Sequence, residues 1–171
     1  MKKENEEKQW YVIRTMSRQE RKVAKRLEQI KLIVYLPLIK TLSQWSDRKK
    51  SVEKPLFSGY IFIQKTTKYI DTLHIPGVVN IIKHNRKIAI VKQSEIDTIK
   101  SIVKYGYDTT ELPYNKHIEL GTKVVVTQGK LKDLEGILIE NNNEKEFIIY
   151  FESLGNCLKI KVSPKILKPI E

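Results

Sequence analysis

Short apolar runs alternate with amphipathic stretches over residues 8–105 of this 171-residue chain. Runs rich in β-branched and aromatic residues predict strands, and apolar residues at helical spacing predict helices. The elements expected here are strands over 10–15, 33–39, 56–63, 78–83 and 87–91, with helices over 18–30, over 66–73 and after Ser94. This order predicts an α+β sandwich, in which three helices pack against an antiparallel or mixed sheet.

Local signals refine these elements. Ser17 followed by Glu20 predicts a capping box at the start of the first helix. Pro37 cannot donate to a ladder, so the second strand should lie at a sheet edge or contain a bulge there. Residues 41–55 are largely polar, and they predict either a plain connection or an extended hairpin.

The run over 56–63 is short, apolar and rich in aromatic residues. Gly59 within it predicts a bulge or a close backbone approach. Tyr60 and Phe62 share one face of the predicted strand, whereas Ile61 and Ile63 share the other. One face should pack on a core, and the aromatic face must then be covered by helices or by a partner. The pattern leaves both possibilities open.

The pattern changes after residue 105. Residues 106–115 combine Gly, Pro and polar residues without a period, which predicts a linker. Residues 116–171 hold four or five short β-prone runs between turn clusters, which predict a small β-barrel. The expected organisation is an N-terminal domain over 8–105, a linker, and a C-terminal barrel.

The net charge of +12 is unevenly distributed. Residues 1–105 carry 23 basic and 10 acidic side chains, a net charge of +13, whereas residues 106–171 carry 9 and 10, a net charge of −1. A basic first part favours a polyanionic partner such as nucleic acid. A lysine-rich solubilising surface would give the same composition, so both interpretations stay open.

Composition argues against several classes of function. The apolar runs are far shorter than the ~20 residues of a membrane-spanning helix, and the charged N-terminus does not resemble a signal peptide. The single cysteine, Cys157, cannot form an internal disulfide, so a cytoplasmic location is expected. The three histidines lie in unrelated contexts, and no phosphate loop or paired-carboxylate motif occurs. We therefore expect no enzymatic activity, no metal and no cofactor.

Candidate contacts with nucleic acid lie in the first part. The predicted first helix carries a basic face formed by Arg18, Arg21, Lys22 and Lys25. Such a face is either solvated or lies near phosphate groups. Trp45 stands in a polar stretch with few apolar neighbours, so it either folds back on the core or contacts a base, a DNA backbone or a protein.

Residues 124–137 resemble a KOW motif, with a strand, a glycine turn at Gly129, and Gly136 before the next strand. Three further motifs are Trp-Tyr-Val-Ile-Arg-Thr over 10–15, Tyr-Leu-Pro over 35–37, and Phe-Ser-Gly-Tyr-Ile-Phe-Ile over 57–63. With these motifs the chain is similar to the NusG family of transcription elongation factors, from residue 9 to residue 170.

Within that family the chain looks closest to the specialised paralogues of the UpxY, RfaH and LoaP types. Housekeeping members usually have Gly-Pro-Phe after the first barrel strand, where this chain has Gly129-Lys130-Leu131. The resemblance therefore implies antitermination on particular operons and argues against a Rho-binding role.

The resemblance also implies a mechanism. An N-terminal NGN domain would sit on RNA polymerase, contact the clamp helices of its largest subunit, bridge the DNA channel and favour processive transcription. The implied polymerase-binding residues are Arg14, Tyr60, Phe62, Thr66 and Thr67. A hairpin over 43–54 would approach the non-template strand through Trp45, Arg48, Lys49 and Lys50.

The remaining partners implied are non-template DNA or nascent RNA and, through the KOW domain, a ribosomal protein or a regulator. No membrane partner is expected, and the protein should be a monomer. The alternative function is an RNA- or ribosome-binding KOW protein that acts on structured RNA. That alternative explains the charge, but not the aromatic strand or the two-domain layout.

Overall fold

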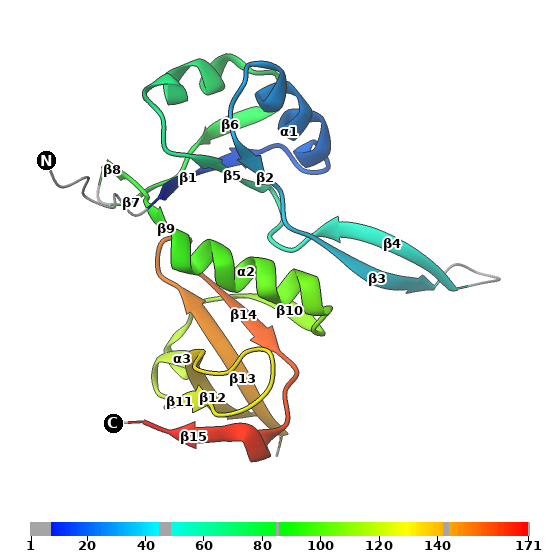
Figure 1. Ribbon diagram of the computed structural model, residues 1–171, viewed down its shortest axis with the longest axis vertical. Coiled ribbons are helices and arrows are strands. Elements are labelled where there is room, and N and C mark those ends of the chain that lie inside the picture. Colours follow the sequence, from blue (N-terminus) through cyan, green and yellow to red (C-terminus); the bar gives the residue numbers. More distant parts are fainter. Residues whose placement is uncertain (1–7, 45–48, 85, 142–143, 171) are drawn as a thin grey trace, which may run out of the picture. The chain divides into compact units, whose positions relative to one another are not determined.

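The structure is a computed structural model, which describes residues 8–44, 49–84, 86–141 and 144–170 (Figure 1). The chain divides into two compact units, which comprise residues 1–97 and 98–171. They are called the first unit and the second unit below, and each is described by itself.

The first unit is built on an antiparallel sheet with β1 at its centre. The strand order is β2-β5-β1-β6, and β9 also pairs with β1. The strands are β1 (Gln9–Thr15), β2 (Val34–Tyr35), β5 (Tyr60–Gln64), β6 (Val78–Ile81) and β9 (Val91–Lys92). Because β1 is flanked on both sides, its alternating side chains define both faces of the sheet.

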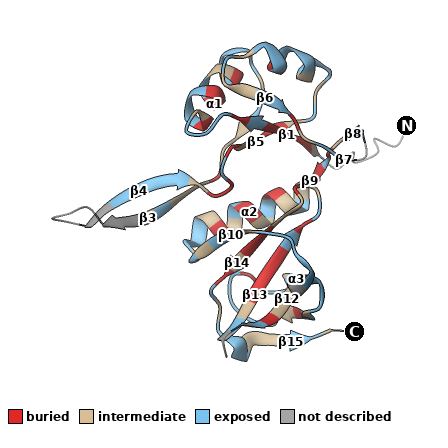
Figure 2. Cartoon of the chain, turned by 180° about the vertical axis from the view of Figure 1, so that it is seen from behind, coloured by how far each residue is buried: buried red, intermediate tan, exposed pale blue. Residues whose placement is uncertain are grey.

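One face of this sheet packs against α1 (Glu20–Gln29) and the 3-10 helix η1 (Thr67–His74), which lie on the same side of it (Figure 1). The core residues of this face come from β1, β5, β6 and α1, and they are Tyr11, Ile13, Val23, Ala24, Leu27, Ile61, Ile63 and Ile81. Figure 2 shows buried segments along β1 and on part of α1. The predicted assignment of Ile61 and Ile63 to a core face is confirmed.

The predicted capping box at α1 is wrong. The helix begins at Glu20 with Gln19 as its N-cap, and no side chain caps it. The Glu20 side chain instead points inward, where its Oε1 accepts a hydrogen bond from the Gly59 N–H at 2.9 Å. The backbone N–H of Gly59, which is distant in sequence, therefore replaces the Ser17 N–H as the hydrogen-bond partner of Glu20.

The first unit also carries two hairpins. Pro37 interrupts the second predicted strand, and after it β3 (Leu38–Gln44) pairs with β4 (Lys49–Pro55) as an extended two-stranded arm. This resolves the open alternative for residues 41–55 in favour of a hairpin. The shorter β7 (Lys83–His84) pairs with β8 (Lys87–Ile88).

The helix α2 (Gln93–Tyr105) spans the division between the units. Its first turn is tied to β1 by a 2.8 Å hydrogen bond from Trp10 Nε1 to Gln93 Oε1. The Glu95 carboxylate accepts from the Lys92 N–H at 3.0 Å. The helix thus begins at Gln93, whereas the sequence predicted a helix that starts after Ser94.

The second unit contains a six-stranded antiparallel sheet in the order β10-β14-β13-β12-β11-β15. Its elements are β10 (Thr109–Pro113), α3 (Lys116–Glu119), β11 (Thr122–Val126), β12 (Glu135–Asn141), β13 (Glu144–Phe151), β14 (Asn156–Ile160), the 3-10 helix η2 (Pro164–Ile166) and β15 (Leu167–Pro169). The predicted fold class is confirmed, with an α+β part followed by a small β-rich part.

Part of the predicted linker is an ordered strand. Residues Thr109 to Pro113 form β10 and pair in register with Ile160 to Asn156 of β14. The polar composition of 106–115 concealed this strand, because an edge strand needs only one partner and little apolar surface.

The KOW-like motif needs glycine at both of its glycine positions, for a different structural reason at each. Gly129 has a φ of 85°, a left-handed conformation that suits the turn. A Cβ on Gly136 would lie 2.4 Å from the Phe147 ring, so only glycine allows this ring to pack against β12.

Candidate functional site

Arg14 and Tyr60 lie opposite each other at one end of the β1–β5 pair. The register places them on the same face of the sheet as Val12 and Phe62. Arg14 is exposed and Tyr60 is half-buried. The guanidinium and the phenol are therefore both available at the surface of the first unit.

Phe62 lies two residues along the same face, but it is completely buried. Its ring centroid is 6.2 Å from that of Tyr35 and 6.3 Å from that of Phe57, with an edge-to-face arrangement toward Phe57. The expectation that Phe62 forms an exposed contact surface with Tyr60 is therefore wrong. Phe57 is also completely buried, and its ring packs against that of Phe62.

Burial in this aromatic cluster has an electrostatic consequence for Tyr35. Removal of the phenol from water raises the pKa of Tyr35 to about 12. Tyr35 therefore stays neutral throughout the physiological range and contributes an uncharged ring to the packing around Phe62.

The turn that leads into β5 is held by β1 and α1 together. Gly59 has a φ of 77°, and its carbonyl accepts from the Thr15 N–H at 2.8 Å. The Glu20 carboxylate binds the Gly59 N–H from the other side. These contacts fix the backbone immediately before Tyr60. Sequence reasoning missed this role of Glu20, although its spacing to Val23 and Leu27 placed it on the buried stripe of the helix.

Thr66 and Thr67 lie beyond the opposite end of β5. Thr66 Oγ1 caps η1 by accepting from the Lys68 N–H at 3.2 Å. Both threonines border a groove of about 580 Å³, whose lining residues are Lys8, Gln9, Tyr11, Gln64, Lys65, Thr66, Thr67 and Tyr69. The groove combines hydroxyl, amide and ammonium groups, with Lys65 Nζ bound to Gln9 Oε1 at 2.7 Å.

The implied polymerase-binding residues therefore form two separate groups. Tyr60 and Thr66 are six residues apart along an extended segment, which corresponds to about 20 Å. Arg14 and Tyr60 form one group at one end of the sheet, and Thr66 and Thr67 form the other. The two groups lie at opposite ends of β5.

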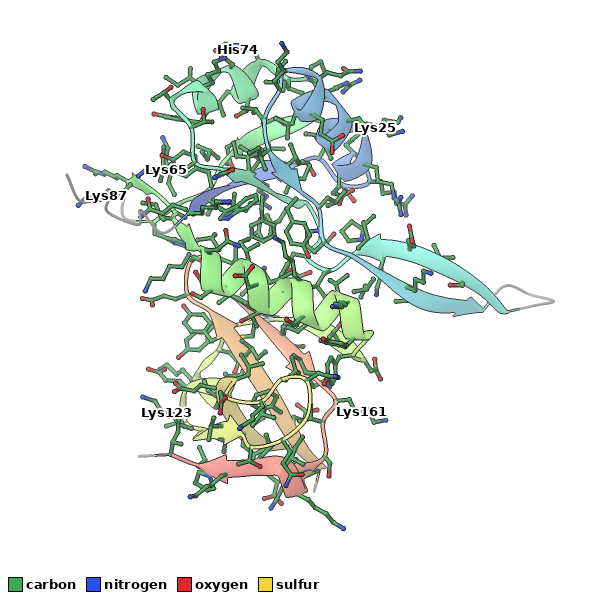
Figure 3. The ribbon with its side chains drawn as sticks, in the orientation of Figure 1. Lys25, Lys65, His74, Lys87, Lys123 and Lys161 are labelled. Carbon is green, nitrogen blue, oxygen red and sulfur yellow. The ribbon has the colours of Figure 1, made fainter. Side chains whose placement is uncertain are left out.

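The basic face of α1 is present and largely exposed. Arg21, Lys22 and Lys25 of α1 are exposed, and Figure 3 shows Lys25 projecting from this helix. Arg18 is also exposed, but it lies in the turn before α1 with a φ of 63°, so the predicted helix start at residue 18 is wrong. Arg21 is also paired with Glu53 of β4 at 3.0 Å. Sequence reasoning missed this pairing, which links α1 to the hairpin and offsets one of its positive charges.

Four predicted nucleic-acid contacts fall on residues 45–50. Trp45 and Arg48 lie outside the described residues, so neither interpretation of Trp45 is decided. Lys49 and Lys50 belong to β4, opposite Gln44 and Ser43. The backbone places both lysines near the described end of the arm.

The KOW-like turn of the second unit contains one buried and one exposed residue. Leu131 is buried, whereas Lys130 is exposed with its ammonium 5.6 Å from the Tyr105 ring centroid. Lys104 lies 5.4 Å from the same centroid. The KOW-like turn thus carries a cation at the surface.

Across the described residues, no group of three or more His, Cys, Asp or Glu side chains is arranged to hold a metal ion. Among the same residues, no helix is long and apolar enough to cross a membrane.

Comparisons with known proteins agree with the motifs. A family model described as transcription termination factor nusG matches residues 8–100. The transcription termination/antitermination protein NusG of Pasteurella multocida (strain Pm70) is 29% identical over 153 residues, which cover 81% of each chain. A solved structure that concerns domain interaction in Thermotoga maritima NusG aligns over 96% of this chain and 98% of that chain, with a TM-score of 0.56 and 21% identity. At that identity, the structural likeness concerns the fold alone.

Proposed function

The chain belongs to the NusG family of transcription factors, and from this premise we propose that it is a specialised elongation and antitermination factor. In this proposal the first unit binds the clamp helices of the largest RNA polymerase subunit and bridges the DNA channel. The protein acts as a monomer and promotes processive transcription of particular operons.

The observation that carries the proposal is the family match over residues 8–100, which spans nearly all of the first unit and reaches into α2. Within that range, Arg14 and Tyr60 supply an exposed cation and a half-exposed aromatic ring on one sheet face. Arginine and tyrosine are the side chains most often found at the energetic centre of protein interfaces. We assign the clamp contact to these two residues, with Phe62 supporting them from the core.

A second polymerase contact would use the groove at Thr66 and Thr67. The groove lies at the other end of β5, so it suits a part of polymerase across the channel from the clamp helices. Two contacts separated in this way would hold both sides of the channel together. This arrangement is compatible with a bridging role.

Nucleic-acid contact would fall to the basic face of α1 and to the hairpin arm. Arg18, Lys22 and Lys25 are exposed, and β3 and β4 extend away from the sheet (Figure 1). Lysine and arginine contacts with phosphate groups give an affinity that decreases as salt increases. Non-template DNA and nascent RNA are both compatible with this surface.

The specialised role rests on the KOW-like turn. Lys130 places an exposed ammonium where housekeeping members usually have an apolar Pro-Phe pair. An exposed charge disfavours the same apolar partner, because binding would remove its water without a matching carboxylate. The second unit would then bind a different regulator or a ribosomal protein.

Retention on core RNA polymerase tests the proposal. The full chain should co-purify with core polymerase, and Tyr60→Ala should reduce binding about tenfold, as expected for an interface anchor. Tyr105→Ala is the matched control, since this tyrosine is also exposed and lies in the second unit. Absence of retention together with tight binding to structured RNA would favour the alternative KOW function. Genome-wide occupancy confined to a few operons would support the specialised role.

A further inference from the structure

We propose that residues 107–114, which include β10, form a detachable strap. In the attached state the strap adds β10 to the edge of β14. In the detached state it is a flexible tether between α2 and α3. This switch lies within the chain and does not depend on the polymerase or nucleic-acid contacts proposed above.

The strap has a capped helix at each end. At Gly106, which has a φ of 65°, α2 ends with a hydrogen bond from the Gly106 N–H to the Val103 carbonyl at 3.2 Å. Asn115 caps α3, because its Oδ1 accepts from the Ile118 N–H at 3.1 Å. Both caps use local partners, so they can persist when the residues between them leave β14.

The strap buries little apolar surface. Its strand lies at one end of the sheet order, where it pairs with β14. Thr110 and Pro113 are exposed, and Thr109, Glu111 and Leu112 are half-buried. Leu112 packs against the margin of a buried cluster that consists of Ile118, Ile139, Ile148 and Cys157. A segment with so little buried apolar surface opens locally at a small fraction of the cost of global unfolding.

Polar contacts hold much of the attached strap. Glu111 Oε1 accepts from Asn156 Nδ2 at 2.8 Å, and the Asp108 carbonyl accepts from the Lys161 N–H at 3.0 Å. Thr109 Oγ1, by contrast, is buried without a hydrogen-bond partner among the described residues. Detachment returns this hydroxyl and the Glu111 carboxylate to water, which offsets much of what the hydrogen bonds contribute. The attached and detached states are therefore close in free energy.

The attached strap also covers the single cysteine of the chain. Leu112 lies opposite Cys157 on one side. Tyr150 lies opposite Cys157 on the other side, and the ring of Tyr114 stacks on it with centroids 4.4 Å apart. Cys157 is completely buried, and burial raises the pKa of its thiol to about 11. Detachment removes Leu112 and Tyr114 from this cover, so the reactivity of the native thiol reports it.

Detachment changes the length of free chain between the two helices. In the attached state, residues 106–108 join α2 to β10. Three flexible residues have an r.m.s. reach of about 10 Å, whereas the eight residues of the detached strap have a reach of about 16 Å. The strap therefore sets how far the chain between α2 and α3 can extend.

Hydrogen exchange of the full chain, followed by mass spectrometry, tests detachment in the unmodified protein. The amides of residues 109–112 should exchange at least about a hundredfold faster than those of β12 and β13, because the strap opens without unfolding of the sheet. Equal protection of the strap and of β13 would overturn the proposal, since β10 would then open only together with the whole sheet.

The rate at which Cys157 reacts with Ellman's reagent provides a second test. Glu111→Ala removes the bond to Asn156 but keeps the Leu112 cover, because neighbouring residues of a strand face opposite sides. It should raise the reaction rate about fivefold or more. Glu146→Ala is the matched control, since Glu146 also accepts from a β14 side chain, at 2.9 Å, but lies on β13. It should change the rate less than about twofold. Equal increases in both variants would indicate general destabilisation and would refute a strap.

A disulfide that locks the strap completes the test. Leu112 and Cys157 are directly opposed, which places their Cα atoms about 4.5–5.5 Å apart, within the range of a disulfide. In oxidised Leu112→Cys, exchange of the strap amides should slow to the level of β13, and dithiothreitol should restore fast exchange in the same sample. Fast exchange that persists in the oxidised form would mean that the amides exchange while the strap is attached, which excludes detachment as their route.

Discussion

Two regions of one sheet face in the first unit differ sharply although they lie side by side. Phe62 is completely buried against Tyr35 and Phe57, whereas Tyr60, two residues away, is half-exposed beside the exposed Arg14. The strand period places both aromatic residues on the same face. The difference shows that a shared face does not imply a shared environment.

The neighbours of each region explain this difference. Around Phe62, the adjacent strands and the β5 turn supply Val12, Tyr35 and Phe57, which close over the ring. Around Tyr60 they supply Arg14, which in turn lies opposite Asn80 of β6. The apolar neighbours of Phe62 bury it in the core, whereas the polar neighbours of Tyr60 leave it at the surface. We therefore assign stability to the Phe62 region and partner contact to the Tyr60 region.

The largest effect should come from Phe62→Ala. Removal of a fully buried ring creates a cavity, and we expect a loss of about 3–5 kcal/mol in the free energy of unfolding. Urea denaturation followed by circular dichroism measures this loss. Tyr60→Ala provides the comparison within the same strand and should change the free energy of unfolding by less than about 1 kcal/mol.

Comparable losses in the two variants would contradict the division of the face into core and surface. A small loss in Phe62→Ala with strongly reduced polymerase binding would instead restore Phe62 as a contact residue. Measurement of stability and polymerase retention on the same preparations separates these results.

The sequence predicted the elements that depend on local chemistry. It did not predict features that depend on contacts between residues far apart in the chain. The strand periodicity correctly separated Ile61 and Ile63 from Tyr60 and Phe62. It could not show that Phe57 would fold over Phe62, because the turn at Gly59 reverses the local direction of the chain. Only the KOW-like motif and the motifs of the first part, taken together, indicated the family.

The incorrect predictions for Glu20 and for residues 109–113 have the same physical origin. Glu20 was assigned to a local cap because Ser17 precedes it, but a buried backbone N–H of Gly59 competes for the carboxylate. Residues 106–115 were assigned to a linker because they are polar, but the free edge of β14 binds residues 109–113 as β10. In both cases the deciding hydrogen-bond partner lies at least 39 residues away in sequence.

Glu20→Ala should give the next largest effect. It leaves the buried Gly59 N–H without its carboxylate acceptor from α1, and an unpaired buried donor costs about 1–3 kcal/mol. Glu28→Ala on the exposed side of the same helix is the control and should cost less than about 0.5 kcal/mol. Equal effects of the two variants in urea denaturation would show that the Gly59 turn does not depend on Glu20.

A third, pH-dependent effect should come from Tyr35. Burial raises the pKa of Tyr35 to about 12 from the ordinary value of 10.0. The folded state therefore holds the phenolic proton more tightly than the unfolded state. The resulting stability is fully present below pH 10 and is lost as the pH rises toward 12.

Tyr35→Phe isolates this contribution, because it keeps the ring beside Phe62 and removes the ionisable group. Between pH 10 and about 12, the free energy of unfolding of the unmodified chain should fall more steeply than that of Tyr35→Phe. Burial also raises the pKa of Tyr11, which contributes equally to both proteins and cancels in the difference. Parallel pH profiles would show that Tyr35 is as solvated as a surface phenol.

The smallest effect should come from the ion pair between Arg21 and Glu53, which lies outside both regions. The two side chains are 54% and 46% exposed, so water and salt screen their attraction. A double-mutant cycle with Arg21→Ala and Glu53→Ala should give a coupling energy of about 0.2–1 kcal/mol that decreases in high salt. A coupling well above this range would mean that the pair fixes the hairpin arm against α1. A weak coupling leaves Arg21 free to exchange Glu53 for a phosphate group, which would add Arg21 to the proposed nucleic-acid contact.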